Sequence, residues 1–306
     1  MRTAAIETLT ELAARDAGIC LMTADLGYGA LEAFSGRFPD RFFNLGISEQ
    51  LMSAAAAGMA LSGNVVFTYS IGNFNTLRCI EQIRNDICYH EANVKILSVG
   101  GGVAYGQMGM THHATEDIAM MRALPHMRVL VPADPEEAAA AVRYAAQTDG
   151  PCYIRLAKRG EARLYEKEAD FCPTKLHRLL PGRNVAILGC GPILREGLRA
   201  AGELEKLGFS AGVYSVPCIK PLDVAGVQAL AAAYPLLVTL EEHQVTGGLG
   251  GAVAEVLGEM SGPRSRLCRL GLPDTWSGVV GSREYLLAQY GLTGPQIAET
   301  VAQLLR

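Results

Sequence analysis

The run FFNLGISEQLMSAAAAGMALS, residues 42–62, changes from a strand pattern to a helix pattern within two residues. Its apolar first part ends at Ser48-Glu49, and an alanine-rich helical segment follows at once. Ser48 is a good helix N-cap, and Glu49 would lie in the first helical turn. The run therefore predicts a carboxylate at a strand-to-helix switch, the place where α/β proteins usually bind ligands. The same acid could instead only complement the helix dipole.

The alternation of strand and helix patterns continues on both sides of this run. Apolar runs of strand length occur at residues 19–23, 41–46, 65–69, 94–99, 128–131, 152–156, 185–188, 212–216, 236–240 and 267–270. Helix patterns lie between them, at residues 4–16, 49–61, 75–89, 114–124, 135–147, 193–207, 224–234, 249–257, 283–289 and 296–305. Such alternation implies mostly parallel sheets covered by helices. We therefore predict an α/β protein of two doubly wound domains, residues 1–160 and 184–306, joined by a charged, proline-containing linker at residues 161–183.

The composition is that of an ordinary folded protein and gives no sign of a nucleic-acid or membrane partner. Hydrophobic residues make up 49% of the 306 residues, charged residues make up 19%, and the net charge is −4. No Lys/Arg cluster follows a groove pattern, and no apolar run reaches the ~18 residues that a transmembrane helix needs. The eight cysteines form no CxxC pair, which argues against a disulfide scaffold or a zinc site. Because the N-terminus has an amphipathic helix pattern rather than a signal peptide, we expect a cytoplasmic protein with reduced thiols.

Two glycine-rich segments, at residues 100–109 and 247–251, lack the spacing of a nucleotide-binding loop. Neither fits GxGxxG after a first strand, and no GK[ST] follows either segment. The first segment leads to His112 and His113, whose adjacent positions do not suit a zinc site on one helix face. A histidine beside a glycine loop at the carboxyl end of a strand suits hydrogen bonding to a polar substrate.

Five segments occur in the order of a known family. They are TADL at residues 23–26, NLGISEQ at 44–50, GQMGMTH at 106–112, ALPHMRVLVPAD at 123–134 and EEHQVTGGLG at 241–250. Together they resemble the C-terminal half of a transketolase, namely its pyrimidine-binding domain followed by its C-terminal domain. The resemblance covers nearly the whole chain and assigns the first predicted domain to pyrimidine binding. Deoxyxylulose-phosphate synthases and the beta subunits of 2-oxoacid dehydrogenases share the same frame.

The resemblance implies thiamine diphosphate chemistry. In that family a catalytic glutamate at the position of Glu49 hydrogen-bonds N1′ of the aminopyrimidine, through which the coenzyme is activated. Phe74 matches the aromatic side chain that stacks on the aminopyrimidine, and Ile71 stands where the family has a second aromatic residue. Asp25 falls at an acid near the cofactor. His112 matches the family's catalytic, substrate-facing histidine.

The resemblance also implies substrate contacts. Arg2 aligns with a substrate-phosphate arginine, Lys158 lies near another cationic position, and Arg155 stands at a basic position shared with deoxyxylulose-phosphate synthase. Each of these three could equally be a solvated surface charge. Met108 takes the place of an acid that reads sugar hydroxyls, which puts the ordinary sugar-phosphate substrates in question. Two reactions stay open: transfer of a ketol unit from a ketose or 2-oxo donor to an aldehyde, and transfer of an acetyl unit from pyruvate.

The sequence lacks the family's diphosphate-binding half. No Gly-Asp-Gly run, the family's anchor for Mg²⁺ and the diphosphate, occurs in the chain. We therefore predict one subunit of a split enzyme, whose N-terminal partner subunit carries that run and holds Mg²⁺. A heterotetramer with two copies of each subunit is expected, as is a lack of turnover in the isolated chain. A non-catalytic scaffold subunit that keeps only the fold is the remaining alternative.

Overall fold

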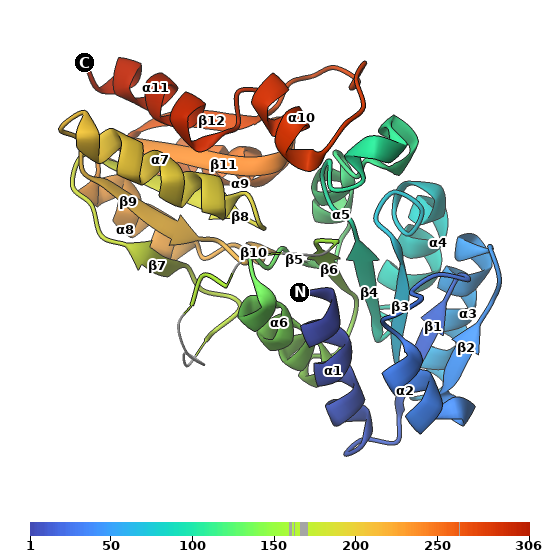
Figure 1. Ribbon diagram of the computed structural model, residues 1–306. Helices are drawn as coiled ribbons and strands as arrows, with labels where there is room; N and C mark the ends of the chain where they lie inside the picture. Colours follow the sequence, from blue (N-terminus) through green and yellow to red (C-terminus); the bar gives the residue numbers. More distant parts are fainter. Residues whose placement is uncertain (159–160, 162, 166–170, 263) are drawn as a thin grey trace.

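Two sheets, each with helices on both faces, form the structure (Figure 1). The computed structural model describes residues 1–158, 161, 163–165, 171–262 and 264–306. Part of the predicted linker, at residues 162 and 166–170, lies outside these ranges. The prediction of an α/β fold with two mostly parallel, doubly wound domains is confirmed.

The first sheet has seven strands: β1 (Ile19–Thr23), β2 (Phe42–Asn44), β3 (Val65–Ile71), β4 (Val94–Val99), β5 (Arg128–Leu130), β6 (Cys152–Leu156) and β10 (Cys218–Lys220). Their order across the sheet is β10-β5-β6-β4-β3-β1-β2. Every pair is parallel except β10 with β5. All residues of β1, β4 and β6 are buried, which fits their mostly apolar sequences; the polar exceptions include Lys95, Ser98 and Arg155.

Helices cover both faces of this sheet. On one face lie α1 (Arg2–Ala13), α2 (Glu32–Arg37) and α6 (Pro135–Gln147), with α1 beside α6 (Figure 1). On the other face lie α3 (Glu49–Leu61) and α5 (Asp117–Ala123). The shorter elements are α4 (Ile80–Gln82), the 3₁₀ turns η1 (Pro39–Arg41), η2 (Leu77–Cys79), η4 (Gly106–Met108) and η5 (Met110–His112), and the π-helical turn η3 (Ile83–Cys88).

The second sheet has the order β12-β11-β8-β9-β7 and is parallel except at its β7 edge. Its strands are β7 (His177–Leu180), β8 (Val185–Cys190), β9 (Ala211–Ser215), β11 (Leu236–Gln244) and β12 (Arg266–Leu272). Its helices are α7 (Leu194–Lys206), α8 (Val224–Ala233), α9 (Leu249–Glu259), α10 (Arg283–Gln289) and α11 (Gly294–Leu305). Helices α7 and α11 pack together on the face of this sheet opposite α8 and α9.

A single apolar core joins the two domains. Met52 of α3 and Met121 of α5 belong to the same buried cluster as Leu237 of β11 and Val253 of α9. The outer face of each sheet has a separate core. Because the middle core is shared, the two domains hold each other in a fixed relation.

Three local features differ from the sequence prediction. Strand β7 lies in the interval predicted as linker; its residues alternate between half-buried and exposed, so it has no continuous apolar run. Strand β10 is only three residues long and joins the first sheet although it follows β9 in the chain. The helix expected at residues 75–89 begins as a turn and then changes from 3₁₀ to α to π geometry.

A buried ionic cluster fastens the domains beside this core. Arg155 on β6 donates its Nε to Asp117 Oδ2 at 2.7 Å and its Nη2 to Oδ1 at 3.2 Å. The same Nη2 donates to the carbonyl oxygens of Ala114 (2.7 Å) and Glu242 (3.0 Å), the latter on β11 of the second domain. The Glu242 carboxylate in turn accepts from the backbone N–H of Val103 at 2.9 Å. Arg155 therefore bridges both sheets and the start of α5.

We expect Asp117→Ala to lower the free energy of unfolding by about 3–5 kcal/mol, because it leaves the buried Arg155 guanidinium without a counterion. Urea denaturation followed by circular dichroism measures this loss. The control is Glu203→Ala, which removes an exposed pair with Lys206 and should cost less than about 0.5 kcal/mol. Equal stability of the two variants would contradict the bridging role.

Candidate active site

The predicted site residues gather at one edge of the first sheet. Asp25, Phe74 and Lys158 follow the ends of β1, β3 and β6, respectively. Glu49 begins the helix after β2, and His112 lies in the loop after β4. Because these strands are parallel, their carboxyl ends meet at the same edge, where open α/β sheets form their ligand sites.

The Glu49 side chain is buried, with 1% of its surface exposed. Its Oε1 accepts from Ser70 Oγ at 3.2 Å, and its Oε2 accepts from Arg78 Nη1 at 2.7 Å. Ser48 occupies the N-cap position as expected, but its side chain makes no capping bond. The Glu49 carboxylate is therefore directed toward the end of β3 and the turn that follows it, not into solvent.

A guanidinium contacts this carboxylate, and two aromatic rings follow in a chain of contacts. Phe74 lies in the turn after β3, with its centroid 5.0 Å from the ring centroid of His112 at an interplanar angle of 61°. The guanidinium carbon of Arg78 lies 4.4 Å from the Phe74 centroid. We call Glu49, Ser70, Phe74, Arg78 and His112 the Glu49 cluster. It combines a buried acid, an aromatic face and an imidazole, so it suits a planar heterocycle that carries N–H donors.

The two adjacent histidines have different surroundings. His112 is half-buried, and its Nδ1 lies 3.1 Å from Thr111 Oγ1. His113 is buried, and within the described ranges its Nε2 has no hydrogen-bond partner. Burial lowers the pKa of His113, which keeps that ring neutral at neutral pH. His112 is the histidine that the structure brings to the Glu49 cluster.

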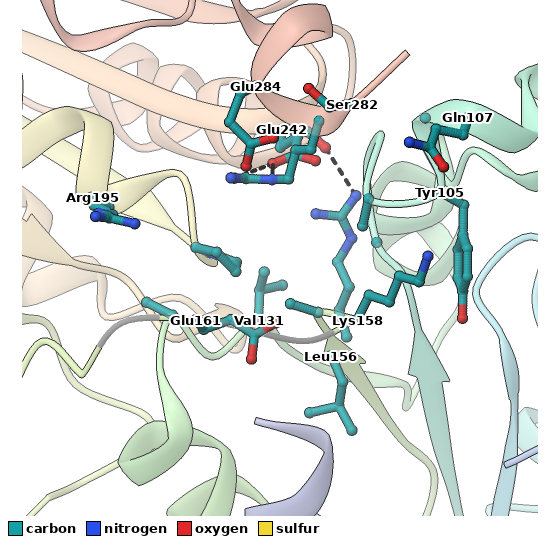
Figure 2. Close-up of a pocket in the computed structure, with 18 of the residues that line it drawn as sticks. Tyr105, Gln107, Val131, Leu156, Lys158, Glu161, Arg195, Glu242, Ser282 and Glu284 are labelled. Atoms are coloured by element: carbon teal, nitrogen blue, oxygen red, sulfur yellow. Dashed lines mark hydrogen bonds and ion pairs between the residues drawn. The ribbon is translucent and has the colours of Figure 1, made fainter. Parts of the chain in front are cut away.

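A cavity of about 340 Å³ lies between the domains and is lined by residues of both, among them Tyr105, Lys158 and Glu242 (Figure 2). Lys158 points toward Tyr105 there, with Nζ 4.7 Å from the ring centroid. Tyr105 in turn lies 6.3 Å from the His112 ring, which connects the cavity with the cluster. Met108 also lines the cavity, and 56% of its surface is exposed, so it gives the cavity an apolar wall.

The two predicted arginines differ in availability. Arg155 lines the cavity, but its Nε and Nη2 are engaged by the ionic cluster described above. Arg2, the first residue of α1, has a buried Nε without a hydrogen-bond partner in the described part of the chain. Burial raises the pKa of the Tyr105 phenol, and the nearby charge of Arg2 opposes that rise. Because its donors are engaged, Arg155 acts mainly as a structural cation.

Asp25 and Ile71 lie at the strand ends without joining the cluster's hydrogen bonds. Asp25 has a positive φ of 54°, and its carboxylate accepts from Asn44 Nδ2 and Tyr28 Oη, each at 3.0 Å. These two bonds, the one from Asn44 first, lower the pKa of Asp25, so this carboxyl is ionised at neutral pH. Ile71 is the half-buried last residue of β3.

Three residues of the site were not predicted: Ser70, Arg78 and Tyr105. Ser70 belongs to an otherwise apolar strand, and Arg78 has the sequence signature of a solvated helix charge. A signal for Tyr105 was present in the glycine loop. A Cβ added to Gly100, whose φ is +87°, would lie 2.0 Å from Cε2 of the Tyr105 ring. Only glycine at this position therefore avoids a collision with the ring.

Comparison with known proteins assigns both parts of the chain to one family. Residues 1–161 match the transketolase pyrimidine-binding domain, and residues 174–297 match the transketolase C-terminal domain. A putative transketolase C-terminal section from Methanocaldococcus jannaschii is 37% identical over 98% of this chain and 94% of its own length. A subunit of apulose-4-phosphate transketolase from Phocaeicola vulgatus is 34% identical over 98% of this chain and 96% of its own. A solved split-gene transketolase, an inactive beta4 tetramer, is 36% identical with a TM-score of 0.87 and covers 99% of this chain and 97% of its own.

The chain belongs to the transketolase family, whose members depend on thiamine diphosphate. The relatives named above are subunits or sections of transketolases of this type. The Glu49 cluster fits the aminopyrimidine of that coenzyme, since a buried carboxylate and an aromatic face are the groups that an N–H-bearing ring needs. Within the described ranges there is no cluster of three His, Cys, Asp or Glu side chains that could hold a metal. The same ranges contain no helix long and apolar enough to span a membrane.

We expect Gly100→Ala to destabilise the fold by about 1–3 kcal/mol, because it combines an unfavourable φ with a collision against Tyr105. Thermal unfolding of the purified chain measures the effect. Gly58→Ala, at a site within α3 where an added Cβ meets nothing within 4 Å, is the matched control and should gain up to about 1 kcal/mol. A Gly100→Ala chain as stable as the control would show that Tyr105 is free to move.

Proposed function

We propose that this chain is the C-terminal, beta-like subunit of a heteromeric transketolase-type enzyme that uses thiamine diphosphate. The enzyme transfers a two-carbon ketol unit from a ketose or 2-oxo donor to an aldehyde acceptor, a transfer of the class EC 2.2.1.-. The observation that carries the proposal is the buried Glu49 carboxylate, which Arg78 connects to Phe74 and, through that ring, to His112. A scaffold subunit would have no need for a buried acid at this edge.

Four residues of the Glu49 cluster have roles in this proposal. Glu49 shares a proton with the ring nitrogen N1′, and Ser70 fixes the direction of the carboxylate through its bond to Oε1. Phe74 offers a face for the aminopyrimidine. When bound, the coenzyme supplies the electron sink that stabilises a carbanion. His112, half-buried next to Phe74 and open toward Tyr105, is placed to hydrogen-bond the donor's oxygen atoms.

The coenzyme's diphosphate and its Mg²⁺ are assigned to a partner subunit that carries the Gly-Asp-Gly run. Exposed apolar side chains around Glu49 support this assignment. Ile47 is 80% exposed, Leu51 is 56% exposed, and Leu77, next to Arg78, is 52% exposed. Exposed apolar residues grouped around a functional site indicate a protein interface. A relative that matches this chain over 96% of its own length is named as one subunit of a transketolase. We therefore infer that this chain forms a heterotetramer with its partner subunit in the cytoplasm. The isolated chain is expected to be inactive.

The charged and apolar residues at the cavity bear on which substrate the enzyme takes. Lys158, which lines the cavity, and Arg2 are the cations proposed to meet an anionic donor or acceptor, whereas Arg155 is engaged elsewhere. Met108 cannot hydrogen-bond a hydroxyl of that substrate. The alternative reaction that this apolar wall would suit transfers an acetyl unit from pyruvate, as in deoxyxylulose-phosphate synthase or a 2-oxoacid dehydrogenase beta subunit.

We expect Glu49→Ala, assembled with the partner subunit, to lower kcat by about 10²–10⁴-fold, the range for loss of an acid–base group. Size-exclusion chromatography should show that the complex still forms. Glu81→Ala, which changes an exposed acid on the neighbouring segment, is the control with normal activity. Glu49→Gln keeps the volume of the side chain if the alanine variant fails to assemble. Unchanged turnover in both Glu49 variants would overturn the catalytic role and favour a scaffold.

A donor screen separates the two reactions. We expect turnover with hydroxypyruvate or a ketose phosphate and little with pyruvate, measured by product analysis with an aldehyde acceptor. Because the Met108 wall replaces a hydroxyl-reading acid, Met108→Asp should improve the use of a hydroxylated donor severalfold, since a matched hydrogen bond is worth about 1 kcal/mol. Turnover with pyruvate alone would assign the acetyl reaction instead.

A further inference from the structure

In the proposed function, the aminopyrimidine contacts the Glu49 carboxylate and the Phe74 ring. In this structure, Arg78 makes both of these contacts. Its Nη1 donates to Glu49 Oε2 at 2.7 Å, and its guanidinium lies 4.4 Å from the Phe74 centroid. Ser70 bonds the other Glu49 oxygen, and the ring centroid of His112 lies 5.0 Å from that of Phe74. Arg78 is therefore the one side chain in the Glu49 cluster that contacts both the acid and the aromatic ring.

The guanidinium has the properties that this site selects. It is planar, positively charged, rich in N–H donors and able to stack on an aromatic face. An aminopyrimidine protonated at N1′ is also planar and cationic and presents an N–H toward a carboxylate. A carboxylate beside an aromatic face cannot easily distinguish two such groups, because it recognises the same charge, hydrogen bond and π surface in each.

We propose that Arg78 is a built-in competitor of the coenzyme ring, a positioning residue that occupies the aminopyrimidine site and leaves when the coenzyme enters. This inference rests on the proposed function, because it assumes that Glu49 and Phe74 receive that ring. While Arg78 is in place, the buried carboxylate has a counterion. When the coenzyme enters, the carboxylate exchanges one charge-assisted hydrogen bond for another and is never left unpaired.

The surroundings of Arg78 allow this exchange. Its side chain is 44% exposed, whereas that of Glu49 is 1% exposed, so the arginine is the partner that has room to move. It belongs to the short 3₁₀ turn η2, whose first residue, Leu77, is exposed. In the described part of the chain, its side chain bonds only to the Glu49 carboxylate. Leaving the site therefore breaks one ion pair and one stacking contact.

The test compares Arg78→Ala with Arg84→Ala in the complex of this chain with its diphosphate-binding subunit. Arg84 is an exposed arginine on the same segment, and among the described residues its side chain bonds only to the Asn85 side chain. Titration calorimetry gives the dissociation constant of thiamine diphosphate for each variant. We expect Arg78→Ala to bind the coenzyme about tenfold more tightly, as loss of one competing charge-assisted contact predicts. Arg84→Ala should match the wild type, and Arg78→Lys, which keeps the charge but not the planar stack, should lie between.

Affinity that is unchanged or weaker in Arg78→Ala would overturn the inference. If that variant does not assemble, the same comparison is made on this chain without its partner subunit. The probe is then 4-amino-5-hydroxymethyl-2-methylpyrimidine, and ligand-observed NMR measures its binding. Glu49→Ala separates this result from failure of the proposed function. If Glu49→Ala weakens coenzyme binding but Arg78→Ala does not tighten it, only the role of Arg78 is wrong. If the wild-type complex does not bind thiamine diphosphate, or binds it equally well without Glu49, the proposed function fails as well.

Discussion

A carboxylate with 1% of its surface exposed must be paired, and the site is organised around how Glu49 meets that requirement. An unpaired buried charge would be neutralised or would destabilise the fold. Ser70 and Arg78 supply the pairing from the end of β3 and the turn behind it. These donors fix the direction of the acid, and the same pairing makes the position receptive to any planar cation that can replace the guanidinium.

Two features of the architecture form the site around this acid. The parallel sheet brings the ends of β1 through β4 and β6 to one edge, so residues far apart in sequence become neighbours. The buried bridge from Arg155 to Asp117 and to the carbonyl of Glu242 then sets the second domain against that edge. The cavity beside Tyr105 exists because both domains contribute walls, which makes Arg155 important to the site without giving it a free donor for substrate.

Sequence reasoning succeeded where a local pattern dictates the result. The bounds of β1, β4, β6 and α3 agree with the expected ones, because fully buried strands and an alanine-rich helix leave unambiguous patterns. The position of Glu49 at a strand-to-helix switch was likewise visible. The roles of residues that act through contacts with distant parts of the sequence were not visible. Arg155 has the same sequence signature whether it meets a substrate or the buried Asp117, and Arg78 resembles any solvated helix charge. The pairing of β10 with β5 joins segments about 90 residues apart, which no short pattern encodes.

The central claim is that Glu49 holds the aminopyrimidine of thiamine diphosphate while a second subunit holds its diphosphate. A crystal structure of the two-subunit complex with the coenzyme tests it most directly. We expect a Glu49 carboxylate oxygen at hydrogen-bond distance, about 2.6–3.2 Å, from N1′, with the guanidinium of residue 78 displaced from the Phe74 ring. A coenzyme whose N1′ contacts some other group, with the Glu49–Arg78 ion pair intact, would contradict the account.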